Sequence, residues 1–254
     1  MTSGPHAALP RTEAVRHPRT AMLHGLRPAF RAVINRRWNV EYRGTENVPA
    51  TGPLVVVSNH IGWLDGPMMA IVGPRPVHAL TKREMFSGAL GRFLVGAGQI
   101  PVSRFEVDPL AVKTALRVLR DGGVAGVFPE GTRGAGEMVT AARGAAYLAM
   151  ASGAPVLPMS FLGTRLAGSA SSLPPAGTRI VVSFGSPLAV EQQDWPRRSD
   201  EVAALTERVR QAIIATVAEA LDATGMELPG AIPETDGTSP DVGPASESSK
   251  AEHD

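Results

Sequence analysis

Short apolar runs alternate with longer amphipathic segments between residues 38 and 189. This alternation is typical of α/β proteins, because central strands are apolar on both faces whereas the helices between them are apolar on one. The predicted strands cover seven ranges, namely 39–42, 54–58, 77–80, 100–102, 124–128, 156–161 and 180–184. We therefore predict an α/β fold, with helices filling the gaps between the strands.

Two helices are marked by their ends or by their periodicity. Residues 109–120 follow Asp108, which is a good N-cap, begin with Pro109 and stop before Gly122. A last helix is predicted from about residue 200 to 223, where apolar side chains recur at helical spacing. These side chains are Val202, Leu205, Val209, Ile213, Val217 and Leu221. We expect this helix to pack on the sheet.

A further amphipathic helix is predicted over residues 19–37. Its apolar positions are Leu23, Leu26, Phe30 and Ile34, and residues 1–37 contain seven arginines against the single acid Glu13. Such a helix either lies on an anionic membrane surface or packs against the protein core, and the sequence leaves both interpretations open.

The ends of the chain differ in composition from the middle. Residues 1–18 lack periodicity, and residues 226–254 are rich in Pro, Ser, Thr, Gly and acids, so both are predicted to be disordered. Residues 222–254 contain eight acids against Lys250 alone. We expect a single domain over residues 19–225, preceded by a disordered N-terminus and followed by a disordered acidic tail.

Composition excludes several kinds of site. The chain has no cysteine, which removes disulfides, thiolate metal sites and a cysteine nucleophile, and its histidines are too scattered for a zinc site. We expect no metal. No run of about 18 apolar residues occurs, and the N-terminus lacks the layout of a signal peptide. These features favour a cytoplasmic protein that touches a membrane at most from that side.

The stretch VVVSNHIGWLDGPM, residues 55–68, places polar chemistry at the end of an apolar strand. Open α/β sheets bind their ligands at the carboxyl ends of strands. Asp65 would accept a hydrogen bond from one ring nitrogen of His60 if the four intervening residues turn back, leaving the other nitrogen to act as a base. The alternative is an ordinary polar residue at the end of a strand.

Two further strand ends carry charged side chains. The segment FPEGTR, residues 128–133, follows a strand with a tight turn that presents Glu130 and Arg133, and QIPVSR, residues 99–104, ends at Arg104. An arginine there either binds phosphate with two hydrogen bonds or simply pairs with a nearby carboxylate. Apolar walls with clustered cations suit a substrate with a phosphate and a long hydrocarbon chain.

These motifs together resemble a known family. NHIGWLD matches the Asn-His-x-x-x-x-Asp block of the glycerophospholipid acyltransferases, and the whole series is similar to the 1-acylglycerol-3-phosphate acyltransferases. The segments RGTENVP at 43–49, KREMF at 82–86 and APVLPMSFLG at 154–163 also follow in the family's order. The resemblance covers about residues 38–190, and the motifs around His60 and Glu130 are highly specific as a pair.

The resemblance implies a reaction. A fatty acyl group moves from a coenzyme A or acyl-carrier-protein thioester to the 2-hydroxyl of lysophosphatidic acid, giving phosphatidic acid, with no other cofactor. By similarity, His60 is the general base and Asp65 holds it. The residues implied to bind the acceptor are Arg104, Glu130, Gly131, Thr132 and Arg133.

The resemblance also implies a structure and a location. It implies a mixed, largely parallel central sheet flanked by helices, and a peripheral position at the inner face of the cell membrane. The sequence departs from the family at Ser103, where an acidic residue often stands, and in an N-terminal helix that is less apolar than in members that embed deeply. The first departure weakens the assignment of Arg104, and the second indicates a shallow or electrostatic membrane contact.

Other functions use the same features. A related lysolipid, glycerol 3-phosphate or an acylated amino-acid lipid would react with the same base. A non-catalytic lipid-binding scaffold would keep the fold without the reaction, although intact His60, Asp65 and Arg133 argue against it. A nucleic-acid binder is disfavoured, because only Phe30 and Trp38 lie near the basic N-terminus to stack on bases.

Overall fold

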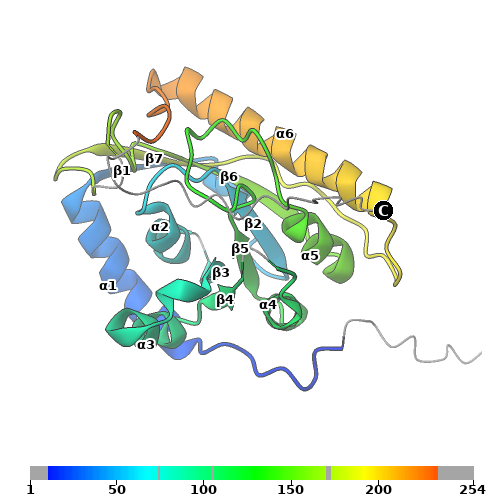
Figure 1. Cartoon of the computed structure of the whole chain (residues 1–254). Helices are drawn as coiled ribbons and strands as arrows, with labels where there is room; N and C mark the ends of the chain where they lie inside the picture. The colour runs from blue at the N-terminus through cyan, green and yellow to red at the C-terminus, as the bar shows by residue number, and fades with distance from the viewer. Residues whose placement is uncertain (1–10, 74, 104–105, 170–172, 234–254) are drawn as a thin grey trace, which may run out of the picture.

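The protein is built around a seven-stranded sheet (Figure 1). The computed structural model describes residues 11–73, 75–103, 106–169 and 173–233. The strands are β1 (Asn39–Arg43), β2 (Leu54–Ser58), β3 (Val77–Lys82), β4 (Ile100–Val102), β5 (Val124–Val127), β6 (Val156–Leu162) and β7 (Arg179–Phe184). Their order across the sheet is β1-β7-β6-β2-β5-β3-β4. All seven strands predicted from the apolar runs are therefore confirmed, with ends shifted by at most two residues.

The sheet is mixed and largely parallel, as the family resemblance implies. Among the described residues, five strand pairings are parallel and the pairing of β6 with β7 is antiparallel. The strand β2 lies between β5 and β6 and is parallel to both. Their carboxyl ends therefore meet at one edge of the sheet, and the loops that follow these three strands are neighbours.

Helices connect the strands and cover both faces of the sheet. They are α1 (Ala21–Arg37), α2 (Asp65–Val72), α3 (Gly88–Gly96), α4 (Pro109–Arg120), α5 (Gly144–Ser152) and α6 (Ser199–Thr224), with short 3₁₀ turns at Thr45–Asn47 and Arg83–Met85. The helices predicted at 109–120 and at about 200–223 are confirmed. In α4 the Asp108 carboxylate accepts a hydrogen bond from Ala111 N at 3.0 Å, as an N-cap should.

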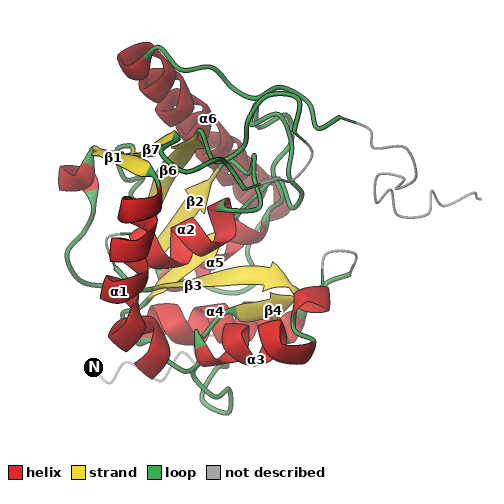
Figure 2. Ribbon diagram, turned by 90° about the vertical axis from the view of Figure 1, so that its left-hand side faces the viewer, coloured by secondary structure: helices red, strands yellow, loops and turns green. Residues whose placement is uncertain are grey.

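Helices lie on both faces of the sheet (Figures 1 and 2), and the core has two layers, one on each face. Alternate residues of β2 supply them: Val55 and Val57 face α4, α5 and α6, whereas Leu54 and Val56 face α1 and α2. Since β2 is buried on both sides, its end is held rigidly. A residue that directly follows β2 is thus fixed in position by the core.

The predicted N-terminal helix exists as α1, but its apolar residues do not form one stripe. Leu23 and Ile34 are buried against the domain, while Leu26 and Phe30 are exposed. The helix is fastened by Arg27, whose Nε donates a hydrogen bond to the Ile71 carbonyl at 2.9 Å. One face of α1 therefore packs on the domain, and a second apolar face is open.

Both segments predicted to be disordered include residues that contact the domain. Thr12 is buried and its hydroxyl accepts a hydrogen bond from Arg120 Nη1 at 2.6 Å, and the ring of His17 lies edge-on to His78 with centroids 5.4 Å apart. After α6, Leu228 packs against the core. These are pairings between distant parts of the chain, which composition does not reveal. The remaining predicted tail residues, 1–10 and 234–254, lie outside the described part of the chain.

Candidate functional site

His60 and Asp65 lie together at the carboxyl end of β2. The Nδ1 atom of His60 is 2.9 Å from Asp65 Oδ2, and the Asp65 side chain is fully buried while that of His60 remains 18% exposed. With Nδ1 donating to Asp65, Nε2 is the nitrogen left to accept a proton. The geometry expected from the five-residue spacing is present.

The turn between the two residues is closed by the same carboxylate oxygen. Asp65 Oδ2 also accepts hydrogen bonds from Ile61 N at 2.7 Å and Gly62 N at 2.8 Å. Asp65 is the first residue of α2, so a negative charge at this place suits the positive end of the helix. One buried oxygen thus fixes both the loop backbone and the imidazole.

Gly62 allows this loop to approach the segment after β6. A Cβ atom at Gly62 would lie 2.6 Å from the Thr164 carbonyl oxygen, which is closer than non-bonded atoms tolerate. The glycine is therefore required by the close backbone contact, rather than by an unusual backbone angle.

Two contacts from the loop after β5 hold His60 from the other side. Its ring stacks on Phe128, with centroids 4.2 Å apart and planes at 22°, and its backbone N–H donates to Glu130 Oε1 at 3.0 Å. In addition, Gly134 N donates to the His60 carbonyl at 2.8 Å. The motif FPEGTR is thereby tied to the histidine at both of its ends.

Glu130 has a structural partner in this arrangement. Burial raises the pKa of its carboxyl group, although the hydrogen bond from the His60 backbone opposes that effect. The Glu130 carboxylate accepts a hydrogen bond from the His60 N–H. The hydrogen bonds therefore do not support the alternative interpretation, in which Glu130 pairs with Arg133.

Arg133 lies in the segment between these two ties. Its Nη1 atom is buried and has no hydrogen-bond partner among the described residues. A buried guanidinium nitrogen without an acceptor is costly, so a ligand that brings an anionic oxygen would be favoured there. Gly131 and Thr132, at the tip of the turn, are exposed. Arg104 lies outside the described residues.

Three residues of the site were not predicted from the sequence. Asn59 is fully buried and bonds to the backbone of Phe161 twice, accepting from its N–H at 2.9 Å and donating to its carbonyl at 3.1 Å. Phe128 and the buried Arg165 also support His60 or its loop. Asn59 and Phe128 stand inside the recognised motifs, whereas Arg165 carries no sequence signal beyond its position after a buried strand.

Ser58 is not available as a nucleophile in this structure. Its side chain is fully buried, and its hydroxyl donates to Asn59 Oδ1 at 3.2 Å. The serine nearest to His60 in the sequence is therefore not exposed beside the imidazole.

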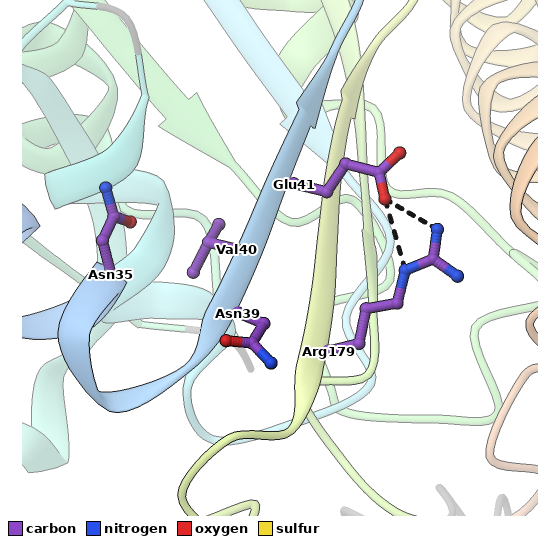
Figure 3. Close-up of a pocket in the computed structure, with 5 residues that line it drawn as sticks. All are labelled: Asn35, Asn39, Val40, Glu41 and Arg179. Carbon is purple, nitrogen blue, oxygen red and sulfur yellow. Dashed lines mark hydrogen bonds and ion pairs between the residues drawn. The ribbon is translucent and has the colours of Figure 1, made fainter.

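A hollow of about 440 Å³ lies elsewhere, at the edge of the sheet (Figure 3). It is lined by Asn35, Asn39, Val40, Glu41 and Arg179. Glu41 Oε2 accepts two hydrogen bonds from Arg179, at 2.7 and 3.2 Å, so the charges there are already paired. This hollow lacks a histidine base, and we assign it no role in the chemistry.

Two further features concern the described part of the chain as a whole. None of its helices combines the length and the apolar character needed to cross a membrane. No three histidine, aspartate or glutamate side chains are grouped there so as to hold a metal ion.

Comparison with known proteins extends these observations. The profile of the family described as Acyltransferase matches residues 39–162, a range that includes His60, Asp65 and residues 130–133. The 1-acyl-sn-glycerol-3-phosphate acyltransferase of Bacillus subtilis (strain 168) is 31% identical over 189 residues, which are 73% of this chain and 92% of that protein. The alpha enzyme of that name from Mus musculus is 38% identical over 125 residues, 47% of this chain and 44% of its own.

A solved structure shares the fold. The 1-acyl-sn-glycerophosphate (LPA) acyltransferase PlsC from Thermotoga maritima superposes with a TM-score of 0.60 at 22% identity, covering 78% of this chain and 79% of that one. The Bacillus subtilis match shows membership of the same family as well as a shared fold, because it spans nearly the whole of that relative at 31% identity. The chain therefore belongs to the 1-acyl-sn-glycerol-3-phosphate acyltransferase family and is an acyltransferase.

Proposed function

We propose that this enzyme transfers a fatty acyl group from an acyl-CoA or acyl-carrier-protein thioester to the 2-hydroxyl of 1-acyl-sn-glycerol-3-phosphate. The product is phosphatidic acid. The observation that carries the proposal is the His60–Asp65 pair, held against a loop in which a buried nitrogen of Arg133 lacks a partner. The choice of acceptor is supported by the substrate for which the Bacillus subtilis and Mus musculus relatives are named.

In the proposed reaction His60 is the general base. Its Nε2 takes the proton of the 2-hydroxyl as the oxygen attacks the thioester carbonyl carbon. The tetrahedral intermediate then collapses, the C–S bond breaks, and the thiolate leaving group receives the proton from the imidazolium. Asp65 stabilises the imidazolium and keeps the proton on Nδ1. No acyl-enzyme is formed, which agrees with the buried hydroxyl of Ser58.

The developing oxyanion needs hydrogen-bond donors that are already in place. The amides of Ile61 and Gly62 donate to Asp65 Oδ2, and the amide of Gly131 donates to the Phe128 carbonyl. These three amides are therefore engaged, and we assign the role to the amide of Thr132 at the exposed tip of the turn.

The acceptor phosphate is assigned to Arg133, whose guanidinium offers a forked set of donors. Arg104, which lies outside the described residues, is proposed as a second phosphate ligand by family resemblance alone. Glu130 acts indirectly in this scheme, because its carboxylate holds the His60 backbone rather than the substrate.

We also propose that the enzyme works at an anionic membrane surface, at the inner face of the cell membrane. Exposed apolar residues of α1 and α3 form one face, which we call the α1–α3 face: Leu26, Phe30 and Val33 on α1 and Leu90 and Phe93 on α3. Phe30 and Phe93 meet edge-on, with centroids 6.1 Å apart. Neither helix contains an acid, α1 contains four arginines and α3 contains Arg92, and this positive charge favours contact with anionic lipid.

The first prediction concerns the acceptor. Purified protein incubated with labelled acyl-CoA or acyl-carrier protein should acylate 1-acyl-sn-glycerol-3-phosphate at the 2-hydroxyl, as identified by mass spectrometry of the product. Glycerol 3-phosphate and lysolipids with an esterified phosphate, supplied in parallel, should react at least tenfold more slowly. Preferred acylation of one of these acceptors would instead establish that lipid as the substrate.

The second prediction concerns the base. His60→Ala should lower kcat by a factor of about 10² to 10⁴, which is the usual contribution of general-base catalysis. The measurement is initial-rate kinetics on protein whose folding is checked by circular dichroism. His17→Ala, which removes a histidine remote from the site, serves as the control and should leave kcat unchanged. Near-normal turnover of the His60 variant would exclude this mechanism.

The third prediction concerns phosphate binding. Arg133→Ala should raise the KM of the acceptor about 10- to 100-fold, since a hydrogen bond to a charged group contributes about 1.5–3 kcal/mol, and should leave the thioester KM within about threefold. Arg143→Ala is the matched control, because this nearby arginine donates to Ser199 instead. Equal increases in both KM values would mean that Arg133 is structural.

The fourth prediction concerns the membrane. The double variant Phe30→Ser and Phe93→Ser should bind phosphatidylglycerol vesicles at least tenfold more weakly than the unaltered protein, as measured by co-sedimentation, because the apolar area inserted into the lipid is reduced. Trp195→Ser removes an exposed aromatic residue outside the α1–α3 face and should have no effect. Undiminished binding by the double variant would rule out this face as the contact.

A further inference from the structure

Arg165 is buried in a way that is unusual for an arginine. It follows β6 and is only 2% exposed, although charged side chains are rarely buried unless they are fully paired. Burial lowers the pKa of its guanidinium, while the negative charge of Asp65 acts in the opposite direction. Its burial therefore has to be compensated by hydrogen bonds.

Four backbone carbonyls provide that compensation. The Nε atom donates to Ile61 O at 2.6 Å, Nη1 to Ser169 O at 3.0 Å, and Nη2 to Gly134 O at 3.2 Å and also to Gly230 O. These acceptors come from the loop after β2, the loop after β6, the loop after β5 and the segment after α6. Because the guanidinium is planar and rigid, it fixes the relative positions of all four segments.

Two of the four carbonyls belong to peptide segments that also hold the base. Ile61 donates its N–H to Asp65 Oδ2 and offers its carbonyl to Arg165. Gly134 donates its N–H to the His60 carbonyl and offers its own carbonyl to Arg165. The backbone that follows His60 is thus connected to one guanidinium twice, directly at Ile61 and through Gly134, without any contact between Arg165 and the imidazole being required.

The segment after α6 completes the arrangement. A Cβ atom at Gly136 would lie 2.6 Å from Ile61 Cγ2 and 3.0 Å from Leu228 Cδ2, so these residues are packed without free space. Gly230, two residues beyond Leu228, accepts from Arg165. The segment after α6 and Ile61 therefore both lie against Gly136, and this segment shares the Arg165 guanidinium with the loop of His60.

We propose that Arg165, braced by residues 228–230, is a positioning residue for acyl transfer, which keeps the loop of His60 at the distance from the acceptor hydroxyl that proton transfer requires. This inference rests on the proposed role of His60 as base. Displacing a catalytic group by about 1 Å costs about 10²-fold in rate, so loosening the loop should affect turnover more than substrate binding.

The first test uses single substitutions in the full chain. Arg165→Met should lower kcat at least tenfold and leave both KM values within about threefold, and Arg165→Lys should give an intermediate loss. Rates are measured well below the melting temperature and are expressed per folded molecule. A structural role alone would lower the melting temperature and leave kcat unchanged, which would overturn the proposal.

A matched control is available at the opposite edge of the sheet. Arg75 is partly buried and also donates to two loop carbonyls, those of Gly122 at 2.8 Å and Pro49 at 3.4 Å. Arg75→Met should lower the melting temperature, because the two hydrogen bonds to loop carbonyls are lost, and should leave kcat unchanged. A similar fall in kcat for the Arg75 and Arg165 variants would also contradict the positioning role.

The second test uses the chain end. A protein ending at Pro233 should keep its kcat, whereas one ending at Gly225 should lose about as much as Arg165→Met. A chain that carries Arg165→Met and also ends at Gly225 should show little further loss of kcat, because both changes remove the hydrogen bond between Arg165 and Gly230. Multiplied losses, or full activity of the chain ending at Gly225, would overturn the proposal. Should Arg165→Met fail to fold, Arg165→Lys and the two shortened chains decide the question.

The role of His60 as base and the role of Arg165 in positioning it can be tested separately. An active His60→Ala variant would remove the base itself. An inactive His60→Ala variant together with normal turnover of the Arg165 variants and of the chain ending at Gly225 would leave the base in place and remove the positioning role alone.

Discussion

The site depends on one buried carboxylate oxygen. Asp65 Oδ2 accepts hydrogen bonds from the His60 ring and from the amides of Ile61 and Gly62, all within 2.9 Å. A carboxylate buried without such donors would be strongly unfavourable, and with them it determines the shape of the loop. The same oxygen therefore orients the imidazole and closes the turn. This explains why a histidine followed five residues later by an aspartate predicts that the two side chains lie together.

The sheet topology decides which loops meet this turn. Since β2 lies between β5 and β6 and is parallel to both, its loop touches the FPEGTR segment on one side and residues 164–165 on the other. Asn59 strengthens the second contact by bonding to the Phe161 backbone with its side chain, much as a further residue of β2 would. The order of the strands thus determines both which side chains pack in the core and which loops form the site.

The sequence was informative where the signal is local. Apolar runs located all seven strands, and the motif around His60 located the residues that come together. It failed where a contact joins distant segments: composition marked residues 226–254 as disordered, yet Leu228 and Gly230 reach the site loops. The four carbonyls of Arg165 belong to residues up to 104 positions away, and carbonyl acceptors exist at every position, so no residue pattern identifies them. The apolar residues of α1 were likewise predicted to form one stripe, but the structure buries some of them and exposes others. The reason is that α2 covers only one side of the helix.

The pairing of β1 with β7 has a consequence for how the protein is made. Among the described residues, β1 bonds only to β7, although some 135 positions separate them along the chain. As the polypeptide leaves the ribosome from its N-terminus, β1 has no neighbour until β7 has emerged, and such long-range closure is slow. The sheet is therefore complete only after nearly the whole domain has left the ribosome.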